Sequence, residues 1–497
     1  MKRDISLLLL LVMLISSSMM GQYVVEYPYF LSSYIYNLPL IGSSYFPLPR
    51  PGTSYESMRL RSLGSGFEGL IADSYTDHFR NPGVRIEDHT QVFGDVGSVN
   101  DFGKFMLGSF AEPGHGTIGG ALIFDRLQNT ESTTEYSNTP PSPSSSSTTK
   151  GTVTTTNENT GGRLSYTMWN SSTATIGGAY EYMHRNDRTE NVSAYMSFSP
   201  SYTSTRKLIY ETSTGGDIHV ITVGATVALE DAQLHLRGRG VFSSYEITQR
   251  YENRERSGSF VNSSISNSPT DIKTKSGLAS LTYIVSPNEG SAVRILLEVA
   301  VTSYDAPGSS LFQYESGDTL TTTYSSTTKG KRNTEGSVVD IKVGAGFQRA
   351  FVDNVVGYAG FSANYVYNSA DGDLHSESTQ SSPPGTTSTS DVLMHATRDG
   401  VDVRMPIGME YFVGEHVVVR GGVEPRYRTG ESFDESTTIY SGPSTSLAKS
   451  KVDRRSLQLA TSLGASIYHH EFGEISVMFG RNFADTYLWS FFLRYFI

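Results

Sequence analysis

Apolar and polar residues alternate with a period of two along most of this chain. The clearest case is 487–497, where Tyr487, Trp489 and Phe491 begin a series of large apolar residues at every second position. Successive side chains of a β-strand point to opposite faces, so this alternation predicts strands with one apolar face. The same pattern recurs at 293–301, 339–347, 401–411 and 417–426, with charged residues at intervening positions. The sequence therefore predicts an all-β fold.

The connections between these strands are of two kinds. Short turns, such as Glu230–Ala232 and Asp353–Asn354, alternate with long stretches rich in Ser, Thr, Asn, Gly and Pro. The long stretches lie near 127–161, 187–216, 250–271, 305–335, 369–394 and 429–452. A β-helix or propeller would keep a fixed period. The variable lengths instead favour one antiparallel barrel, with short turns at one end and long loops at the other.

The pattern predicts sixteen strands, with a pair at about 90–99 and 103–113 followed by seven pairs from 117 to 497. An even number is required if the chain enters and leaves the barrel at the same end. The first pair has only a short connection, so it could lie outside the wall. In that case fourteen strands would remain.

The first residues have the pattern of a secretory signal. Lys2 and Arg3 precede an apolar run at 5–15, and small or polar residues follow it. The run is shorter than the roughly 20 residues of a membrane-spanning helix. We therefore predict a cleaved signal peptide at 1–21. The chain has no Cys, which excludes disulfide bonds and a lipid-anchored Cys.

Composition favours a barrel that spans a membrane. Only 37% of the residues are hydrophobic, which is low for a helical membrane protein but expected where apolar residues occupy alternate strand positions. In a barrel of this size the apolar face contacts lipid and the charged face lines the lumen. The formal net charge of −11 argues against a nucleic-acid partner. We predict a single transmembrane antiparallel β-barrel at 90–497.

The C-terminal strand resembles that of bacterial outer-membrane β-barrels, which the barrel assembly machinery reads as an insertion signal. That strand usually ends in Phe, whereas here Phe496 is followed by Ile497. The resemblance implies location in the outer membrane, with membrane lipid and the barrel assembly machinery as partners.

Residues 22–89 precede the predicted barrel. Their first part is rich in Tyr and Pro, and Pro at that density prevents a central strand. This part is either an arm in the periplasm or lumen, or a disordered linker. The six residues Gly64–Gly69 fit the pattern GxGxxG, but no βαβ unit surrounds them. We therefore predict no dinucleotide site there.

Residues 72–83 resemble a segment of the long-chain fatty-acid transporter-like barrels. In that family a short region with Asn-Pro precedes the first strand and forms part of a hatch in the lumen. Here Asn81-Pro82 match, with Gly83 where the family usually has Ala. The resemblance implies a hatch and an apolar pocket reached through it, with lateral release of the substrate. The candidate hatch residues are Asp73, Asp77, Arg80, Asn81 and Pro82. A plain turn before the first strand is the alternative.

The charged positions of the strands are candidates for the lining of the lumen. They are Arg237, Arg239, Arg294, Glu298, Asp340, Lys342, Arg404, Glu410, Arg420, Glu424 and Arg426. Opposed basic and acidic walls would orient small polar solutes. The balanced charges would equally fit a lumen crossed by salt bridges and closed. In either case the faces are too polar for a wholly apolar path.

The sequence offers no catalytic signature. It lacks HExxH, the P-loop pattern and Cys, and the neighbouring His469 and His470 would point to opposite faces of a strand. We predict no enzyme activity, no metal site and no cofactor. The predicted function is a channel or transporter for small solutes whose identity the sequence does not give. The alternative is a structural or surface-interaction barrel with a closed lumen, whose Ser/Thr-rich loops bind a partner.

Overall fold

The computed structural model describes most of the chain beyond its N-terminal region. The described residues are 37–39, 45–47, 57–86, 90–99, 102–111, 116–127, 130–138, 146–171, 173–199, 202–257, 259–288, 290–318, 322–381, 385–441, 444–469, 473–481 and 487–496. The predicted signal peptide at 1–21 and the final residue, Ile497, lie outside them.

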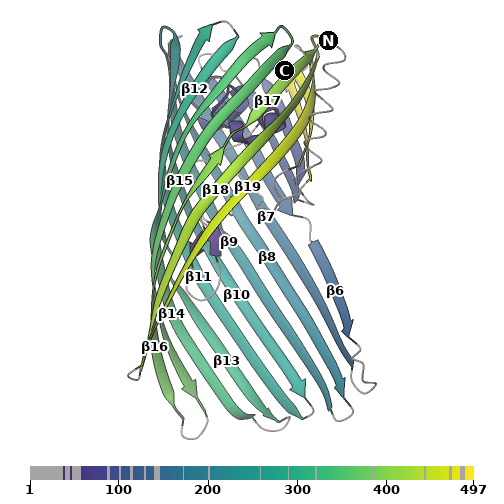
Figure 1. The fold of residues 1–497 in the computed structure, drawn as a ribbon, viewed down its shortest axis with the longest axis vertical. Helices are drawn as coiled ribbons and strands as arrows, with labels where there is room; N and C mark the ends of the chain where they lie inside the picture. The colour runs from purple at the N-terminus through teal and green to yellow at the C-terminus, as the bar shows by residue number, and fades with distance from the viewer. Residues whose placement is uncertain are drawn as a thin grey trace.

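Strands β3 to β21 form one closed antiparallel barrel (Figure 1). Its first half consists of β3 (Gln91–Val99), β4 (Phe102–Ala111), β5 (Gly116–Leu127), β6 (Thr130–Asn138), β7 (Ser146–Ser171), β8 (Ala174–Ser199), β9 (Tyr202–Ala228), β10 (Ala232–Ser257), β11 (Phe260–Asn288) and β12 (Ser291–Asp305). Its second half consists of β13 (Gly308–Asp318), β14 (Thr322–Val352), β15 (Val355–Gln380), β16 (Thr387–Arg404), β17 (Ile407–Val413), β18 (Val417–Tyr440), β19 (Thr445–His469), β20 (Gly473–Arg481) and β21 (Tyr487–Phe496).

These segments make sixteen strands, because three strands are interrupted. The segments β5 and β6 both pair with β7, β12 and β13 both pair with β11 and β14, and β16 and β17 both pair with β15 and β18. Pro307 and Pro406 lie at two of the breaks, where proline has no N–H to give to a ladder. The prediction of sixteen strands is confirmed, and the alternative of fourteen is wrong.

The last strand closes the barrel against the first. β21 pairs with β3 from Leu488↔Val99 to Phe496↔Gln91. Its outward residues Phe491, Leu493 and Tyr495 are exposed, whereas the inward Phe492 is buried. The C-terminal strand therefore presents its apolar set to the surroundings of the barrel, as its alternation predicts.

The wall is very uneven in height. β7 to β11 have 26 to 29 residues and β14 has 31, but β3, β4, β20 and β21 have only 9 or 10. About ten residues cross a bilayer, so the long strands continue far beyond it.

This height corrects the expected extent of the loops. Most residues of the polar stretches predicted as loops are the far ends of strands; β8 and β9, for example, pair through almost all of 187–216. The β-branched Thr residues in these stretches favour strands and pair across them. Sequence polarity alone did not distinguish a solvated strand from a loop.

The near ends of the strands, next to the short turns, carry the apolar outer face. In β12, Ile295, Leu297 and Val299 are exposed, whereas the alternating Arg294 and Glu298 are buried on the inner side. The same division of faces holds in neighbouring strands. The barrel therefore has an apolar outer band and a charged inner face at the same height.

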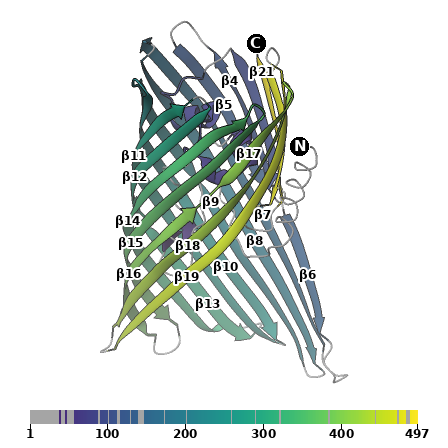
Figure 2. The ribbon, with the colours of Figure 1, turned by 45° about the horizontal axis from the view of Figure 1, so that its top comes forward.

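Residues before β3 lie inside this end of the barrel (Figures 1 and 2). They form α2 (Met58–Leu63), the 3₁₀ turn η2 (Ser65–Phe67) and α3 (Ser74–Arg80), and two further short strands, β1 (Asn37–Pro39) and β2 (Tyr45–Pro47), pair with each other. The Asp73 carboxylate caps α3 by accepting from the Thr76 N–H at 2.9 Å. Among the described residues, no helix is both long and apolar enough to cross a bilayer.

Candidate functional site

We call residues 57–86 the inner segment. Its backbone lies very close to the wall, because the wall residues at the points of contact are glycines. A Cβ added to Gly177 would lie 2.0 Å from the Pro82 carbonyl oxygen, and one added to Gly422 would lie 1.7 Å from the Leu63 carbonyl oxygen. Only glycine therefore fits at these two wall positions while the inner segment stays in place.

Two predicted hatch residues on α3 form ion pairs with predicted lumen residues. Both terminal nitrogens of Arg294 contact the Asp77 carboxylate, with N–O distances of 3.0 and 2.8 Å. Glu298 accepts from both Arg80 and Arg237, and the Arg237 guanidinium also donates to the Arg80 carbonyl oxygen at 3.3 Å. All five side chains are buried. Charge-assisted bonds of this kind are stronger than neutral ones and fix the position of α3.

The Asn-Pro segment attaches to the wall through its backbone and one side chain. The Asn81 amide donates to the carbonyl oxygens of Ala225 and Leu236, at 3.5 and 3.3 Å. The Pro82 carbonyl oxygen accepts from the Thr167 hydroxyl at 2.5 Å. The Asn81 side chain also accepts from the Gly83 N–H at 2.9 Å, which closes a local turn. The Gly83 carbonyl oxygen accepts from the Thr175 hydroxyl as well, so the plain-turn interpretation is incomplete: this turn bonds to four strands, β7, β8, β9 and β10.

The first turn of α2 makes a second charged contact with the wall. Arg59 donates to Glu410 at 2.8 and 3.1 Å and to the Tyr358 hydroxyl at 2.8 Å. Arg420 donates to the same Glu410 at 2.7 Å. Glu410 therefore joins the inner segment to β18 through two guanidinium groups.

The remaining sequence candidates also lie on the inner face. Lys342 is opposite Glu298 in the ladder, Arg404 lies 3.8 Å from Glu424, and Arg426 pairs with Asp402. Arg239 is buried beside this group and Asp340 is two residues from Lys342 on the same face. These charges largely pair with one another or with the inner segment, rather than forming opposed free walls.

His78 is a further buried residue of α3. Its Nδ1 lies 2.9 Å from the Val84 carbonyl oxygen, so Nδ1 carries the proton and donates, and Nε2 accepts from the Ser165 hydroxyl at 3.2 Å. Burial lowers the pKa of His78 to about 4, with the nearby Arg163 acting in the same direction. The imidazole is therefore neutral at pH 7.

Aromatic residues pack the inner segment against the seam of the barrel, where β21 pairs with β3. The Tyr75 ring meets Phe93 of β3, Phe110 of β4 and Phe492 of β21 edge to face, with ring centroids 5.0, 5.7 and 5.8 Å apart. The Arg494 guanidinium of β21 lies 5.8 Å from the centre of the same ring. One side chain of the inner segment thus contacts both the first and the last strand.

The lumen also carries an apolar belt farther from the short turns than the inner segment. The belt comprises Met183, Ile218, Val220, Val241, Tyr245, Ile247, Ile272, Tyr304, Ala306, Val338, Val366, Ala370 and Ala396, each at most 4% exposed. The inner face is charged on both sides of the belt, at Arg239 and at Arg332, so the expectation that no wholly apolar path crosses the lumen stays a prediction. Arg237 and Arg239 were predicted to face inward. Every second residue of a strand points to the same face, so the same alternation places Val241 and Tyr245 inside, and it would have revealed part of the belt.

A cavity of about 360 Å³ lies on the other side of the inner segment, toward the short turns. Arg59, Asp73 and Tyr75 line it from the inner segment, and Arg420 and Glu474 line it from the wall. The inner segment therefore separates an apolar region of the lumen from a charged one. Among the described residues, no group of three or more His, Cys, Asp or Glu could hold a metal ion.

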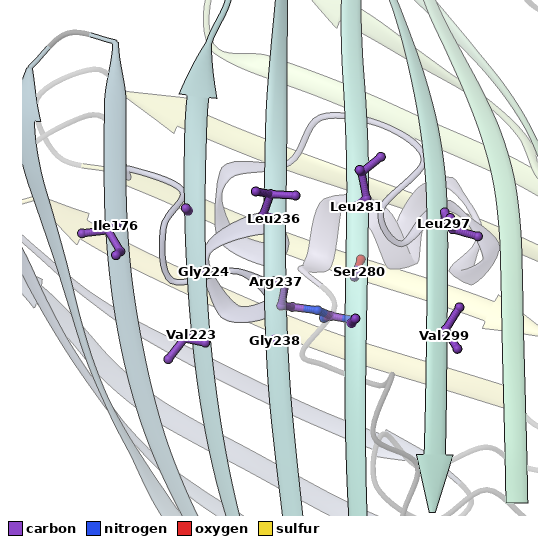
Figure 3. A pocket seen from close by; sticks show the side chains of 12 residues that line it. Ile176, Val223, Gly224, Leu236, Arg237, Gly238, Ser280, Leu281, Leu297 and Val299 are labelled. Carbon is purple, nitrogen blue, oxygen red and sulfur yellow. The ribbon is translucent and has the colours of Figure 1, made fainter.

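The outer face has an apolar groove of about 440 Å³ beside the Asn-Pro contact (Figure 3). Ile176, Val223, Leu236, Leu281, Leu297 and Val299 line it, and Gly238 leaves it without a side chain at its centre. A closed barrel with such an outer face satisfies its backbone polar groups within the sheet and presents apolar side chains to lipid.

The chain is a transmembrane antiparallel β-barrel. Its short turns and inner segment lie at one end, and its long strands continue past the apolar band at the other.

No family model matches the chain, and no curated protein matches it. Among solved structures it is similar to a deltaS2 mutant of the TodX monoaromatic hydrocarbon channel, at 10% identity over 88% of this chain and 96% of that one, with a TM-score of 0.39. It is also similar to the Pseudomonas putida toluene transporter TodX, at 11% identity over 86% and 95% of the two chains (TM-score 0.35). The Neisseria meningitidis FrpB iron transporter matches at 6% identity over 86% and 84% (TM-score 0.28). These similarities are too distant to assign a solute.

Proposed function

We propose that this barrel is a channel that admits small solutes with an apolar body, and that the inner segment is the hatch that closes it. The observation that carries this proposal is the apolar belt on the lumen side of the inner segment. Burial of apolar surface is favourable, so a solute with an apolar body gains free energy by packing against the belt. The belt is buried in this closed state, and the solute has to displace the packing that covers it.

The contacts of the hatch explain how the channel stays closed. Asp77 and Arg80 are each bonded to a wall residue of opposite charge, Arg294 and Glu298 respectively. Separating one such buried pair leaves an uncompensated charge, at a cost of about 3–5 kcal/mol. The closed state is therefore stable, but it can still open, because ion pairs and hydrogen bonds hold these contacts and the chain has no Cys to form a disulfide.

Uptake by intact cells tests this function. We expect Gram-negative cells that carry the protein to take up N-phenyl-1-naphthylamine, an apolar dye that fluoresces after leaving water, faster than cells without it. Uptake of a polar sugar of similar size should not increase. Equal dye uptake by the two kinds of cell would contradict the proposal.

A surface-interaction barrel with a closed lumen is the second candidate function. The observation that favours it is the height of β7 to β11 and β14, which extend far beyond a bilayer-spanning length of about ten residues. Under this function the protein would increase neither dye nor sugar uptake, and planar bilayers would remain silent even after the hatch is loosened.

A further inference from the structure

The wall is low on both sides of the seam, the place where β21 pairs with β3. Four neighbouring strands, β20, β21, β3 and β4, have 9 or 10 residues each. On one side of them, β19 pairs with β20 only from Thr461 onward, so, among the described residues, 445–460 pair with β18 alone. On the other side, β6 pairs with no described strand other than β7. The described strands thus leave two free edges that face each other above the short strands.

This low part of the wall is broad enough to admit a molecule. Four strands lie between β19 and the strand made of β5 and β6, and strands are about 4.8 Å apart, so the free edges are about 24 Å apart. The interval is visible between the yellow β19 and the blue β6 (Figures 1 and 2). Ser446, Ala448 and Ser450 lie on the inner face of β19 yet are exposed. We call this interval the window.

The apolar belt lies at the level of the window's lower edge. Belt residues Val241 and Val338 are next to Phe242 and Val339, the outermost apolar residues of the lipid-facing band on their strands. The belt therefore begins where the bilayer ends. The short strands, which have about the length needed to span a bilayer, end at the same level.

The belt also faces the window. Its residues lie on strands from β8 to β16, and the window lies above β20, β21, β3 and β4. In the ring of sixteen strands these two groups are centred on opposite sides. A molecule that passes through the window at the bilayer surface therefore arrives opposite the belt, and it packs there once it displaces what covers the belt.

The route from the open top is less favourable for an apolar body. Above the belt, the inner face carries Arg185, Asp187 and Arg332. The free edge of β19 carries exposed charged residues, including Lys449 and Lys451, and charged side chains on an edge oppose the addition of another strand. The window is thus better suited to passage than to pairing with a partner's strand.

We propose that the window is the entrance for the solute. An amphiphile with an apolar body, held at the surface of the outer leaflet, enters sideways through the window and packs on the belt without passing the open top of the barrel. This inference rests on the proposed channel function and specifies the physical form in which the solute arrives, which is membrane-associated rather than free in water.

Obstruction of the window by a polymer tests the proposal. The chain has no Cys, so Ala448→Cys provides a single thiol at the window for a maleimide-linked polyethylene glycol that cannot cross the membrane. Ser303→Cys is the matched control, because Ser303 is exposed on the outer face of β12, on the opposite side of the barrel. Uptake of N-phenyl-1-naphthylamine is measured in intact cells before and after labelling.

We expect the label at position 448 to reduce dye uptake to the level of cells without the protein, and the label at position 303 to leave uptake unchanged. Full uptake with the label at 448 would overturn the window as the entrance while leaving the channel function intact. An equal loss with both labels would also overturn it. If the unlabelled variants and the unmodified protein take up no more dye than empty cells, the channel function itself fails.

Discussion

At the scale of single residues, Asp77 is the clearest determinant of the closed state. Its carboxylate contacts both terminal nitrogens of Arg294, and both side chains are buried. The substitution Asp77→Asn leaves the guanidinium without its counter-charge, at a cost of about 3–5 kcal/mol. We expect the hatch to loosen and ion conductance in planar bilayers to rise above the low level of the unmodified protein.

An exchange of charges separates this pair from a general loss of stability. Asp77→Arg combined with Arg294→Asp should restore part of the low conductance, because it restores opposite charges. Asp453→Asn, on the exposed edge of β19, should have no effect. If Asp77→Asn conducts no more than the unmodified protein, this pair does not hold the hatch.

His78 should make closure sensitive to acid. Burial lowers its pKa to about 4 in the closed state, below the ordinary value of 6.5. A displaced hatch exposes the imidazole to water, so protonation favours displacement. Closure is therefore fully stable above pH 6.5 and weakens as the pH falls from 6.5 toward 4, by up to about tenfold per pH unit.

The conductance of the unmodified protein should accordingly rise across that range, and His78→Gln should remove most of the rise because Gln does not titrate there. The measurement is planar-bilayer current as a function of pH. The same pH profile in both proteins would assign the effect to other groups.

At the scale of elements, the strands of the wall accommodate the hatch through missing side chains. Gly177 of β8 has no room for a Cβ beside the Pro82 carbonyl oxygen. In Gly177→Val, the new valine favours the strand conformation, but its side chain occupies the space of the Pro82 carbonyl oxygen and displaces the hatch from the wall. We expect a folded barrel with raised conductance. The control is Gly277→Val on β11, where an added Cβ would have nothing within 4 Å. Equal conductance of the two variants would contradict the fit of hatch to wall.

The strands themselves were largely predictable from the sequence, because alternation depends on each strand's own residues. The alternation at 293–301 correctly placed Ile295 outside and Arg294 inside. The inner segment was harder to predict. Its contacts join residues as far apart as Asp77 and Arg294, and no local pattern specifies such a pairing. The Asn-Pro resemblance pointed to the inner segment but not to the wall residues that bind it.

At the scale of the whole molecule, the uneven height of the wall was not predicted. The polar stretch near 187–216 was predicted to be a loop, although its residues belong to paired strands. Polar residues indicate contact with water, but they do not show whether the backbone is hydrogen-bonded to a neighbouring strand. The ring order was predictable only in part. The C-terminal strand had two possible partners, and the structure selects β3. The belt and the window become visible only when sixteen strands are placed in that ring.

The ring is closed by one short seam, which the hatch supports. The β21–β3 pairing covers only nine residue pairs, and the Tyr75 ring packs on Phe93 and Phe492 from the two strands. Tyr75→Ala removes these contacts, and loss of a large buried aromatic side chain costs about 3–5 kcal/mol. We expect the folded barrel to unfold at a lower temperature in dodecyl sulfate, measured by its change in gel mobility on heating. Tyr195→Ala, on the exposed far part of β8, should leave that temperature unchanged, because Tyr195 contacts no part of the seam. A shift of equal size in both variants would mean that the hatch closes the lumen without stabilising the ring.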